Sequence, residues 1–262
     1  MSEHKARKRF GQNFLHDKAI IGRIIAAIAP TADDHFVEIG PGQGAMTQPL
    51  SEHCGQLDVV ELDRDLADQL EQLDWMAGIR LHRADALHFD FTTISDTPGS
   101  LRLAGNLPYN ISTPLLFHIL TYHQLFRDIH VMLQREVVDR MVAGPGSRTY
   151  GRLSVALAAR CNVESLFVIK PGAFRPAPKV QSAFARLTPL QEPLITAAEA
   201  PLFDEVLRCA FNQRRKQLGN ALRPVLDADA IRAAGVDPQQ RAEQLTVENF
   251  VALTREASAR SG

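Results

Sequence analysis

The sequence predicts an α/β protein with a doubly wound, mostly parallel, seven-stranded sheet and a small C-terminal helical domain. Three observations predict this class. Short apolar runs alternate with longer helical patterns up to about residue 160, as in parallel sheets whose strands are joined by helices. A glycine-rich turn follows the first apolar run. From about Pro201 onward the pattern is only helical.

The strands are expected at short aliphatic runs bounded by turn residues. Two of these runs flank the proline-rich segment Pro171–Pro178, and we expect them to form an antiparallel pair at the end of the sheet. In chain order the expected strands are His35–Ile39, Leu57–Leu62, Ile79–Arg83, Leu101–Ala104, Ile129–Leu133, Leu166–Lys170 and Val180–Leu187.

The helices are expected where apolar residues recur at helical spacing. The composition changes at Thr188-Pro189, and turns separate the later helices. We therefore predict a first domain over residues 1–188 and a small helical domain over residues 189–262. In chain order the expected helices are Lys18–Ala29, Ala45–Glu52, Arg64–Leu73, Pro114–Tyr122, Glu136–Val142, Leu202–Phe211, Arg215–Leu222, Ala228–Ala234 and Thr246–Ala257.

The composition indicates a chain with a substantial core and no membrane segment. With 262 residues, 45% of them hydrophobic, it can form one large domain or a large and a small one. No apolar run approaches the roughly 18–20 residues of a membrane span, and no signal-peptide core follows the basic start Met1–Arg9. Cys54, Cys161 and Cys209 lie far apart and indicate neither a metal pair nor a disulfide framework. We expect a soluble protein in a reducing, cytoplasmic compartment.

Positive charge is unevenly distributed, although the formal net charge is −1. A charge run is usually only a solvated face. Three separated basic clusters on a near-neutral chain nevertheless favour nucleic-acid binding. The clusters are Lys5, Arg7, Lys8 and Arg9; Lys170, Arg175, Lys179 and Arg186; and Arg208, Arg214, Arg215, Lys216 and Arg223 on a predicted helix.

A strand, a glycine turn and a helix follow one another over Val37–Ala45. Glycines in such a turn let the backbone approach a ligand closely. Glu61 ends the next strand, where a carboxylate can bind both hydroxyls of a ribose. The combination predicts a site for a cofactor that contains a nucleoside.

Two cofactors compete for this site. The spacing Gly40-x-Gly42-x-x-Ala45, with Glu61 about 20 residues further on, satisfies a relaxed dinucleotide fingerprint and would suit NAD. The spacing Gly40-x-Gly42-x-Gly44 instead fits S-adenosylmethionine, which has no pyrophosphate. An acidic Glu38 suits a ligand with a positive amino group, and the chain carries no convincing hydride-transfer constellation. We therefore predict S-adenosylmethionine.

A carboxylate, Asp85, follows the third predicted strand. It stands where it could accept a hydrogen bond from the adenine amino group of the cofactor. An exposed turn residue or a helix cap is the alternative. With the glycine turn and Glu61 in register, the ligand role is favoured.

The segment Asn106-Leu107-Pro108-Tyr109 follows another apolar run. It places an amide, a turn-forming proline and an aromatic ring at the carboxyl end of a predicted parallel strand. An adenine amino group needs such groups to act as a nucleophile. The Asn106 oxygen and the Leu107 carbonyl can accept its two hydrogens, and the Tyr109 ring can stack on the base. A strand-end turn with a packed tyrosine is the alternative for the tetrapeptide alone.

The chain as a whole resembles the KsgA family, the small-subunit ribosomal RNA adenine N6-dimethyltransferases. The resemblance covers nearly the whole length, and seven motifs occur in the family's order. The related erythromycin-resistance methyltransferases share the first five and modify an adenine of large-subunit RNA. The motifs are Lys8–Leu15, Val37–Gly44, Glu61–Asp63, Ala84–Ala86, Asn106–Tyr109, Phe174–Val180 and Phe211–Lys216.

The resemblance implies a Rossmann-like methyltransferase sheet and a role for individual residues. Tyr109, and Phe174 from the opposite side, would enclose the target base, with a core or turn aromatic as the alternative for Phe174. No metal and no strong general base is required, so His88, His118, His123 and His130 are expected to be structural or surface residues. The cofactor would contact Asn13, Leu15, Gly40, Gly42, Glu61, Asp85, Ala86 and Asn106. The RNA would contact Lys5, Arg7, Lys8, Arg9, Arg214, Arg215 and Lys216.

The implied activity is transfer of methyl groups to N6 of two adjacent adenosines near the 3′ end of 16S ribosomal RNA, each becoming dimethylated. The implied partner is the immature small ribosomal subunit, approached by a monomer. In this scheme residues 1–188 are catalytic and residues 189–262 bind RNA. Two alternatives stay open: an adenine methyltransferase for another RNA or for DNA, and an assembly factor that binds ribosomes and catalyses little. Intact Glu61, Asp85 and Asn106 disfavour pure binding.

Overall fold

The computed structural model describes residues 12–261, so the expectations for Lys5, Arg7, Lys8 and Arg9 lie outside the described residues. Contacts divide the chain into two compact units. The first comprises residues up to 138 and residues 164–189, and the second comprises residues 139–163 and those from 190 onward. The predicted division at residue 188 lies beside the end of the last strand, but the second unit also takes in a segment from the middle of the chain.

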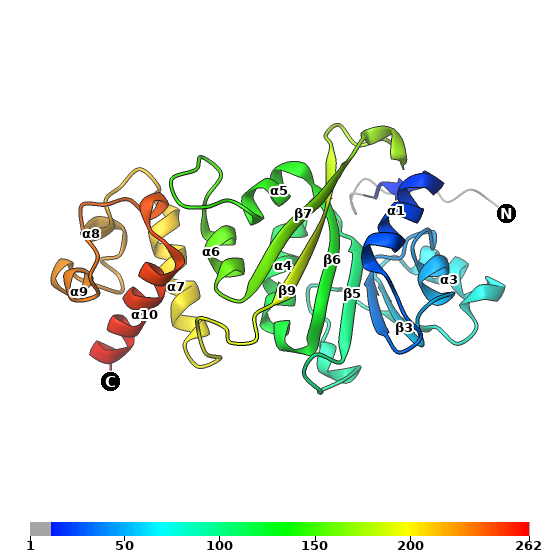
Figure 1. The fold of residues 1–262 in the computed structure, drawn as a ribbon, viewed down its shortest axis with the longest axis horizontal. Coiled ribbons are helices and arrows are strands. Elements are labelled where there is room, and N and C mark those ends of the chain that lie inside the picture. The colour runs from blue at the N-terminus through cyan, green and yellow to red at the C-terminus, as the bar shows by residue number, and fades with distance from the viewer. Residues whose placement is uncertain (1–11, 262) are drawn as a thin grey trace. The chain divides into compact units, whose positions relative to one another are not determined.

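A seven-stranded sheet runs through the first unit in the order β4-β3-β2-β5-β6-β9-β7 (Figure 1). Strands β4, β3, β2, β5 and β6 are parallel to their neighbours, whereas β6 and β9 are antiparallel. The predicted doubly wound, mostly parallel sheet is confirmed. The strands are β2 (His35–Ile39), β3 (Gln56–Glu61), β4 (Arg80–Arg83), β5 (Leu101–Asn106), β6 (Phe126–Gln134), β7 (Cys161–Ile169) and β9 (Ser182–Pro189).

The central strands are buried over almost their whole length. From Phe36 to Ile39 and from Leu57 to Glu61 every residue is buried, because helices cover both faces of a doubly wound sheet. Glu38 and Glu61 are therefore buried carboxylates within these strands. The helices of this part of the chain are α1 (Lys18–Ile28), α2 (Thr47–Ser51), α3 (Arg64–Glu71), α4 (Ser112–Thr121) and α5 (Arg135–Met141).

A two-stranded sheet that the sequence did not predict joins β1 (Phe14–Leu15) to β8 (Phe174–Arg175). The pairing is antiparallel, with Phe14 opposite Arg175 and Leu15 opposite Phe174. Strands of two residues carry no alternation that a sequence pattern can reveal. The pairing ties the start of the described chain to a segment about 160 residues later.

An ionic network holds the edge of the sheet at which its strands begin. Arg102 is 5% exposed and donates to Asp34 at 2.7 Å and to Asp128 at 2.8 and 2.9 Å. It also donates to the carbonyls of Ile28 and Ala29, which end α1. A buried cation with carboxylate and carbonyl partners satisfies groups that a helix end otherwise leaves open. The opposite edge, where the strands end, is the one left for a ligand.

The second unit is helical, with α6 (Arg152–Ala158), α7 (Ala200–Asn212), α8 (Leu218–Ala221), α9 (Ala228–Ala233) and α10 (Val247–Ser261). Helix α6 was not predicted because Leu153 to Leu157 are all buried, so the segment has no polar face and no amphipathic period. It packs against α7, which explains why its segment belongs to this unit. No helix within residues 12–261 is long and apolar enough to cross a membrane.

The prediction of a helix over Arg215–Leu222 was wrong in its first half. Arg214, Arg215 and Lys216 lie in a turn, and α8 begins only at Leu218. The Arg214 side chain donates to the Tyr150 carbonyl at 2.9 Å and to the Arg148 carbonyl at 3.2 Å. These bonds to the backbone of another loop favour the turn over a continuous helix.

Candidate active site

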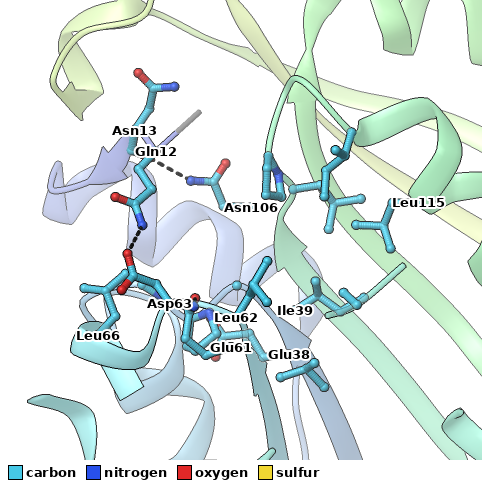
Figure 2. A pocket seen from close by; sticks show the side chains of 18 of the residues that line it. Gln12, Asn13, Glu38, Ile39, Glu61, Leu62, Asp63, Leu66, Asn106 and Leu115 are labelled. Atoms are coloured by element: carbon cyan, nitrogen blue, oxygen red, sulfur yellow. Dashed lines mark hydrogen bonds between the residues drawn. The ribbon is translucent and has the colours of Figure 1, made fainter. Parts of the chain in front are cut away.

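A cavity of about 260 Å³ lies at the carboxyl ends of β2, β3 and β5 (Figure 2). Ligand sites of open α/β sheets form at this edge, because the loops that follow neighbouring parallel strands converge there. Five segments line the cavity, and they contain all the residues predicted to bind the cofactor. These segments contain Asn13, Gly40, Glu61, Asp85 and Asn106.

The glycine turn forms one wall of this pocket. Gly42 has a φ of +59°, a conformation that favours glycine. Its N–H donates to Oε2 of Glu61 at 3.3 Å, and a Cβ at this position would lie 3.2 Å from the Phe14 ring. The turn thus offers a surface of bare backbone that larger residues would fill.

The turn rests on an aromatic ring. Gly44 has a φ of +83°, and a Cβ at this position would lie 2.4 Å from the ring of Trp75. Trp75 is half-buried in a short 3-10 helix after α3, Asp74–Met76. A side chain at this position would collide with the ring and would strain the backbone, so the turn requires glycine here.

Glu61 ends β3 with both oxygens held. Its Oε1 accepts from the Asp63 N–H at 2.8 Å and its Oε2 accepts from Gly42 at 3.3 Å. The side chain is 7% exposed, and burial raises the pKa of Glu61 above its usual range. A carboxylate fixed by two backbone donors retains lone pairs for two ribose hydroxyls.

Glu38 is a buried carboxyl with unsatisfied hydrogen-bonding capacity. It is 2% exposed and borders the pocket. Neither its Oε2 nor the nearby Thr47 hydroxyl has a hydrogen-bond partner among the described residues. Burial, reinforced by the charge of Glu61, raises the pKa of Glu38 to about 8. A cationic ligand group beside it would favour the ionised form.

Replacing Glu38 with glutamine is expected to change how stability depends on pH. Because the folded pKa is about 8 and the ordinary value is 4.5, the folded protein binds more protons between these values. The stability of the ligand-free protein therefore falls as pH rises through this window. In Glu38→Gln this fall should be absent, so the stability of the variant relative to the wild type should rise by roughly 4 kcal/mol between pH 5 and pH 8.5. Calorimetric unfolding from pH 5 to pH 9 measures it, and parallel stability curves would show that Glu38 is already ionised.

Asp85 follows β4 and is half-buried at the pocket wall. Its Oδ1 accepts from the Leu87 N–H at 2.9 Å, and its Oδ2 lies 3.4 Å from His88 Nδ1. The next residue, Ala86, is buried and lines the same wall. The structure therefore shows the turn-capping role of Asp85, while its contact with the cofactor stays a prediction.

Asn106 is the last residue of β5 and points across the pocket mouth. Its Nδ2 donates to the Asn13 carbonyl at 2.9 Å, as Figure 2 shows. The next residue, Leu107, donates its N–H to the Met132 carbonyl at 3.1 Å and is fully buried. The backbone of the tetrapeptide is thereby anchored to β6, and the Asn106 side chain is held from the opposite side.

Tyr109 borders the same pocket with its ring held in place. The Tyr109 and Ser182 hydroxyls lie 2.5 Å apart, and Ser182 is fully buried in β9. Burial, opposed by the Ser182 hydroxyl, raises the pKa of Tyr109, so the phenol stays protonated at neutral pH. The ring is therefore available as an uncharged stacking surface.

Tyr109→Ala and Tyr109→Phe are expected to differ in their effects on methyl transfer. The alanine variant would lose the predicted base stacking, worth roughly 1–3 kcal/mol. The phenylalanine variant keeps the ring and loses one hydrogen bond, so we expect a loss within about fivefold. Single-turnover rates at saturating cofactor and RNA measure both. Ser182→Ala is the matched control, and a loss in Tyr109→Phe as large as in Tyr109→Ala would assign the role to the hydroxyl.

Phe174 does not line the pocket. It is 2% exposed and packs in the core with Leu15, Ala173 and Phe184. Phe174 therefore occupies the core position that the sequence analysis gave as the alternative to stacking on the target base. Stacking of Phe174 on a target base stays a prediction and requires its ring to leave this core.

Comparison with known proteins identifies the class of this site. A family model described as ribosomal RNA adenine dimethylase matches residues 3–258. The chain belongs to the ribosomal RNA adenine dimethylase family. The predicted family is confirmed, and with it a methyltransferase that uses S-adenosylmethionine and acts on ribosomal RNA.

Individual relatives extend over nearly the same length. The chain is 54% identical to the ribosomal RNA small subunit methyltransferase A of Pseudomonas putida over 96% of this chain and 94% of that protein. It is 52% identical to the protein of the same description from Aromatoleum aromaticum, over 100% of this chain and 97% of that protein. These identities agree with the family match over the whole chain.

Two solved structures share the fold of this adenine dimethylase family member. A dimethyladenosine transferase from Plasmodium falciparum has a TM-score of 0.78 and 22% identity, and it covers 95% of this chain and 98% of its own. The 23S rRNA methyltransferase ErmE has a TM-score of 0.70 and 24% identity, and it covers 94% of this chain and 100% of its own. At these identities the likeness concerns the fold.

The residues of the pocket fit the cofactor of this dimethylase family. The bare backbone at Gly42 leaves room that a Cβ would fill. The Glu38 carboxyl is buried with an unpartnered oxygen, which suits the positive amino group of S-adenosylmethionine. Leu62, 47% exposed at the pocket wall, offers an apolar surface beside Glu61.

Among the described residues, the three predicted to bind RNA differ in their surroundings. Arg214 directs its guanidinium to the Tyr150 and Arg148 carbonyls and to Glu243 at 3.4 Å. Arg215 and Lys216 are exposed. Their contacts with RNA stay predictions, and Arg214 also has a structural role.

Two residues of the site were not predicted from the sequence. Gln12 donates to Asp63 at 3.0 Å, and Ser182 holds Tyr109. Gln12 and Asp63 both lie within motifs that carry the family resemblance, so these motifs could have drawn attention to the pair. Ser182 carries no signal, since only the register of β9 against β6 brings it to the site.

Proposed function

We propose that this chain transfers methyl groups from S-adenosylmethionine to N6 of two adjacent adenosines near the 3′ end of 16S ribosomal RNA. The product is N6,N6-dimethyladenosine, formed during assembly of the small ribosomal subunit. The observation that carries the proposal is Asn106 at the end of β5, with its amide held at the mouth of the cofactor pocket. The names of the relatives support the small subunit as the source of the RNA.

Different pocket residues would contact different parts of the cofactor. Glu61 would accept from the ribose hydroxyls, and Asp85, next to Ala86, would accept from the adenine amino group. Gly40 and Gly42 would face the methionine end, with Glu38 beside its amino group. Asn13 and Leu15 would complete the wall from the N-terminal side. When bound, S-adenosylmethionine supplies a methyl group already activated by its positive sulfur.

The tetrapeptide would prepare the target base. The lone pair of an adenine amino group is delocalised into the ring, which makes the nitrogen a poor nucleophile. The Asn106 oxygen and the Leu107 carbonyl would each accept one N–H, which favours a more tetrahedral nitrogen. The Tyr109 ring would stack on the base and hold it for in-line attack. A new N–C bond then forms as the S–C bond breaks, and the nitrogen releases a proton to solvent.

The substrate would be an unpaired adenosine. A base must leave its stack to enter a pocket of this kind, and single-stranded RNA loops make this inexpensive. We propose a monomer that acts in the cytoplasm on the immature small subunit. Residues 1–188 would carry the catalytic site, and residues 189–262 would bind RNA.

Neutralising Arg215 and Lys216 together to glutamine is expected to weaken RNA binding and flatten its dependence on salt. The slope should fall by roughly 0.7–0.9 for each phosphate that the variant no longer neutralises, while cofactor affinity stays constant. Arg214 is left in place because it holds the backbone of another loop. Binding titrations between roughly 50 and 300 mM salt measure the slope.

The matched control neutralises Arg232 and Arg260, which are exposed and paired with Asp229 and Glu256 in the same unit. It removes the same charge from another place and should leave the slope nearly unchanged. Equal slopes in both double variants would show that Arg215 and Lys216 are only a solvated face.

Mass mapping of methylated nucleosides tests the function itself. Immature small subunits are incubated with labelled cofactor, and the RNA is digested and sequenced by mass. We expect label on two adjacent adenosines near the 3′ end. Label on large-subunit RNA or DNA would assign another substrate, and cofactor binding without transfer would favour an assembly factor.

A further inference from the structure

The residues Gln12–Leu15 form a strap across one side of the cofactor pocket. Its far end is fixed by the β1–β8 pairing and by the bond from the His16 N–H to the Ala173 carbonyl at 3.0 Å. Its near end is fixed by Gln12, whose Nε2 donates to Oδ2 of Asp63 at 3.0 Å. Between these two anchors lies the carbonyl of Asn13, which touches the Asn106 amide (Figure 2).

The strap determines which way the Asn106 amide faces. A backbone carbonyl can only accept a hydrogen bond, so the Asn13 oxygen requires Nδ2 of Asn106 to face it. Oδ1 of Asn106 must then point to the other side, away from the strap. The bond also polarises the amide, which makes its oxygen a stronger acceptor. An amide turned the other way would present a donor to an amino group that is itself a donor.

Asp63 makes a firm anchor for the strap. It is 2% exposed and caps α3 with its Oδ1, which accepts from the Asp65 N–H at 3.1 Å. Its own N–H donates to Glu61 at 2.8 Å. The carboxylate is therefore held by the helix and the strand end, and Oδ2 offers Gln12 a fixed, charged acceptor. The Gln12 bond thus connects the ribose side of the pocket to Asn106.

We propose that Gln12 is a positioning residue for methyl transfer. Its bond to Asp63 holds the strap where the Asn13 carbonyl turns the Asn106 oxygen toward the reacting amino group. The inference rests on the proposed function for its effect on rate. Its structural content, the coupling of Gln12 to the Asn106 amide, is independent of what the protein methylates.

Exchanging the hydrogen-bond donor and acceptor between Gln12 and Asp63 tests the proposal. Gln12→Glu places a second carboxylate against Asp63 and removes the donor. Adding Asp63→Asn restores one hydrogen bond in the opposite sense, since the asparagine Nδ2 donates to the new carboxylate while its Oδ1 still caps α3. The matched control is Gln48→Glu, because Gln48 donates to Glu52 at 3.3 Å on the exposed side of α2, outside the pocket.

Two readouts are taken on the full chain. The first is hydrogen exchange of the Asn106 side-chain amide, followed by nuclear magnetic resonance and assigned by its absence in Asn106→Ala. The second is the single-turnover rate at saturating cofactor and RNA. Gln12→Glu should speed the amide exchange and slow transfer about tenfold, the scale of a small misplacement of a catalytic group. The double variant should return both to near wild type, and Gln48→Glu should change neither.

The outcomes separate this inference from the proposed function. Unchanged amide exchange or unchanged rate in Gln12→Glu overturns the inference, and so does a loss that Asp63→Asn fails to rescue. Absence of methyl transfer by the wild-type chain overturns the proposed function instead. In that event the amide exchange alone still decides whether Gln12 controls Asn106.

Discussion

Asn106→Ala is expected to cut single-turnover methyl transfer to small-subunit RNA by about 10²–10³, the usual effect of losing one group that acts in the transition state. The alanine removes the oxygen proposed to accept from the reacting amino group. It also releases the Asn13 carbonyl, which now has a 2.9 Å bond to the amide. RNA affinity should stay within about threefold, because the residues proposed to hold the RNA backbone lie elsewhere.

Asn106→Asp makes the comparison sharper. It keeps the size of the side chain and its acceptors but places a carboxylate against the Asn13 carbonyl. We expect a loss of transfer close to that of alanine, with a larger loss of cofactor affinity because the strap is repelled. If Asn106→Ala transfers methyl groups at nearly the wild-type rate, Asn106 does not activate the amino group. The tetrapeptide would then be only a structural turn.

Glu61→Ala is expected to weaken S-adenosylmethionine binding by about 1–3 kcal/mol, since in the proposed complex two ribose hydroxyls lose their acceptor. The change also frees the N–H groups of Gly42 and Asp63, which Glu61 holds at 3.3 and 2.8 Å. Glu61→Gln separates these effects, because its amide oxygen can keep one backbone donor and one hydroxyl. Titration calorimetry gives the affinity of each variant.

Glu52→Ala serves as the matched control for Glu61. Glu52 is an exposed carboxylate after α2 that accepts only from the exposed Gln48 side chain among the bonds described for it. Its removal should leave cofactor affinity unchanged. A folded Glu61→Ala protein with wild-type affinity would mean that the ribose is held by other groups.

Much of the fold follows from patterns that the sequence displays openly. The strand predicted over His35–Ile39 has the same bounds in the structure, because its apolar residues Phe36, Val37 and Ile39 lie between turn-forming segments. The predictions failed where the pattern itself is absent. Helix α6 is buried from Leu153 to Leu157, β1 and β8 are two residues long, and the turn at Arg214 depends on a loop more than sixty residues away.

The sequence predicted which residues lie at the strand ends of the site, but not which partners hold them. Glu61 and Asn106 end β3 and β5, the two parallel strands on either side of β2, so the topology alone brings them to one pocket. The partners of these residues depend on register and on side-chain direction. Tyr109 meets Ser182 across 73 positions and Asn106 meets Asn13 across 93, and no local pattern encodes either pair. For the same reason the sequence could not decide that Phe174 is a core residue.

The ring beneath the glycine turn provides an optical signal. Trp75 is the single tryptophan of the chain, and it touches Gly44 in the turn that borders the cofactor pocket. Its fluorescence therefore comes from one known position, and any shift of the turn on ligand binding changes the surroundings of the emitting ring. Cofactor affinity can then be followed by intrinsic emission without a label, with Trp75→Phe as the dark reference.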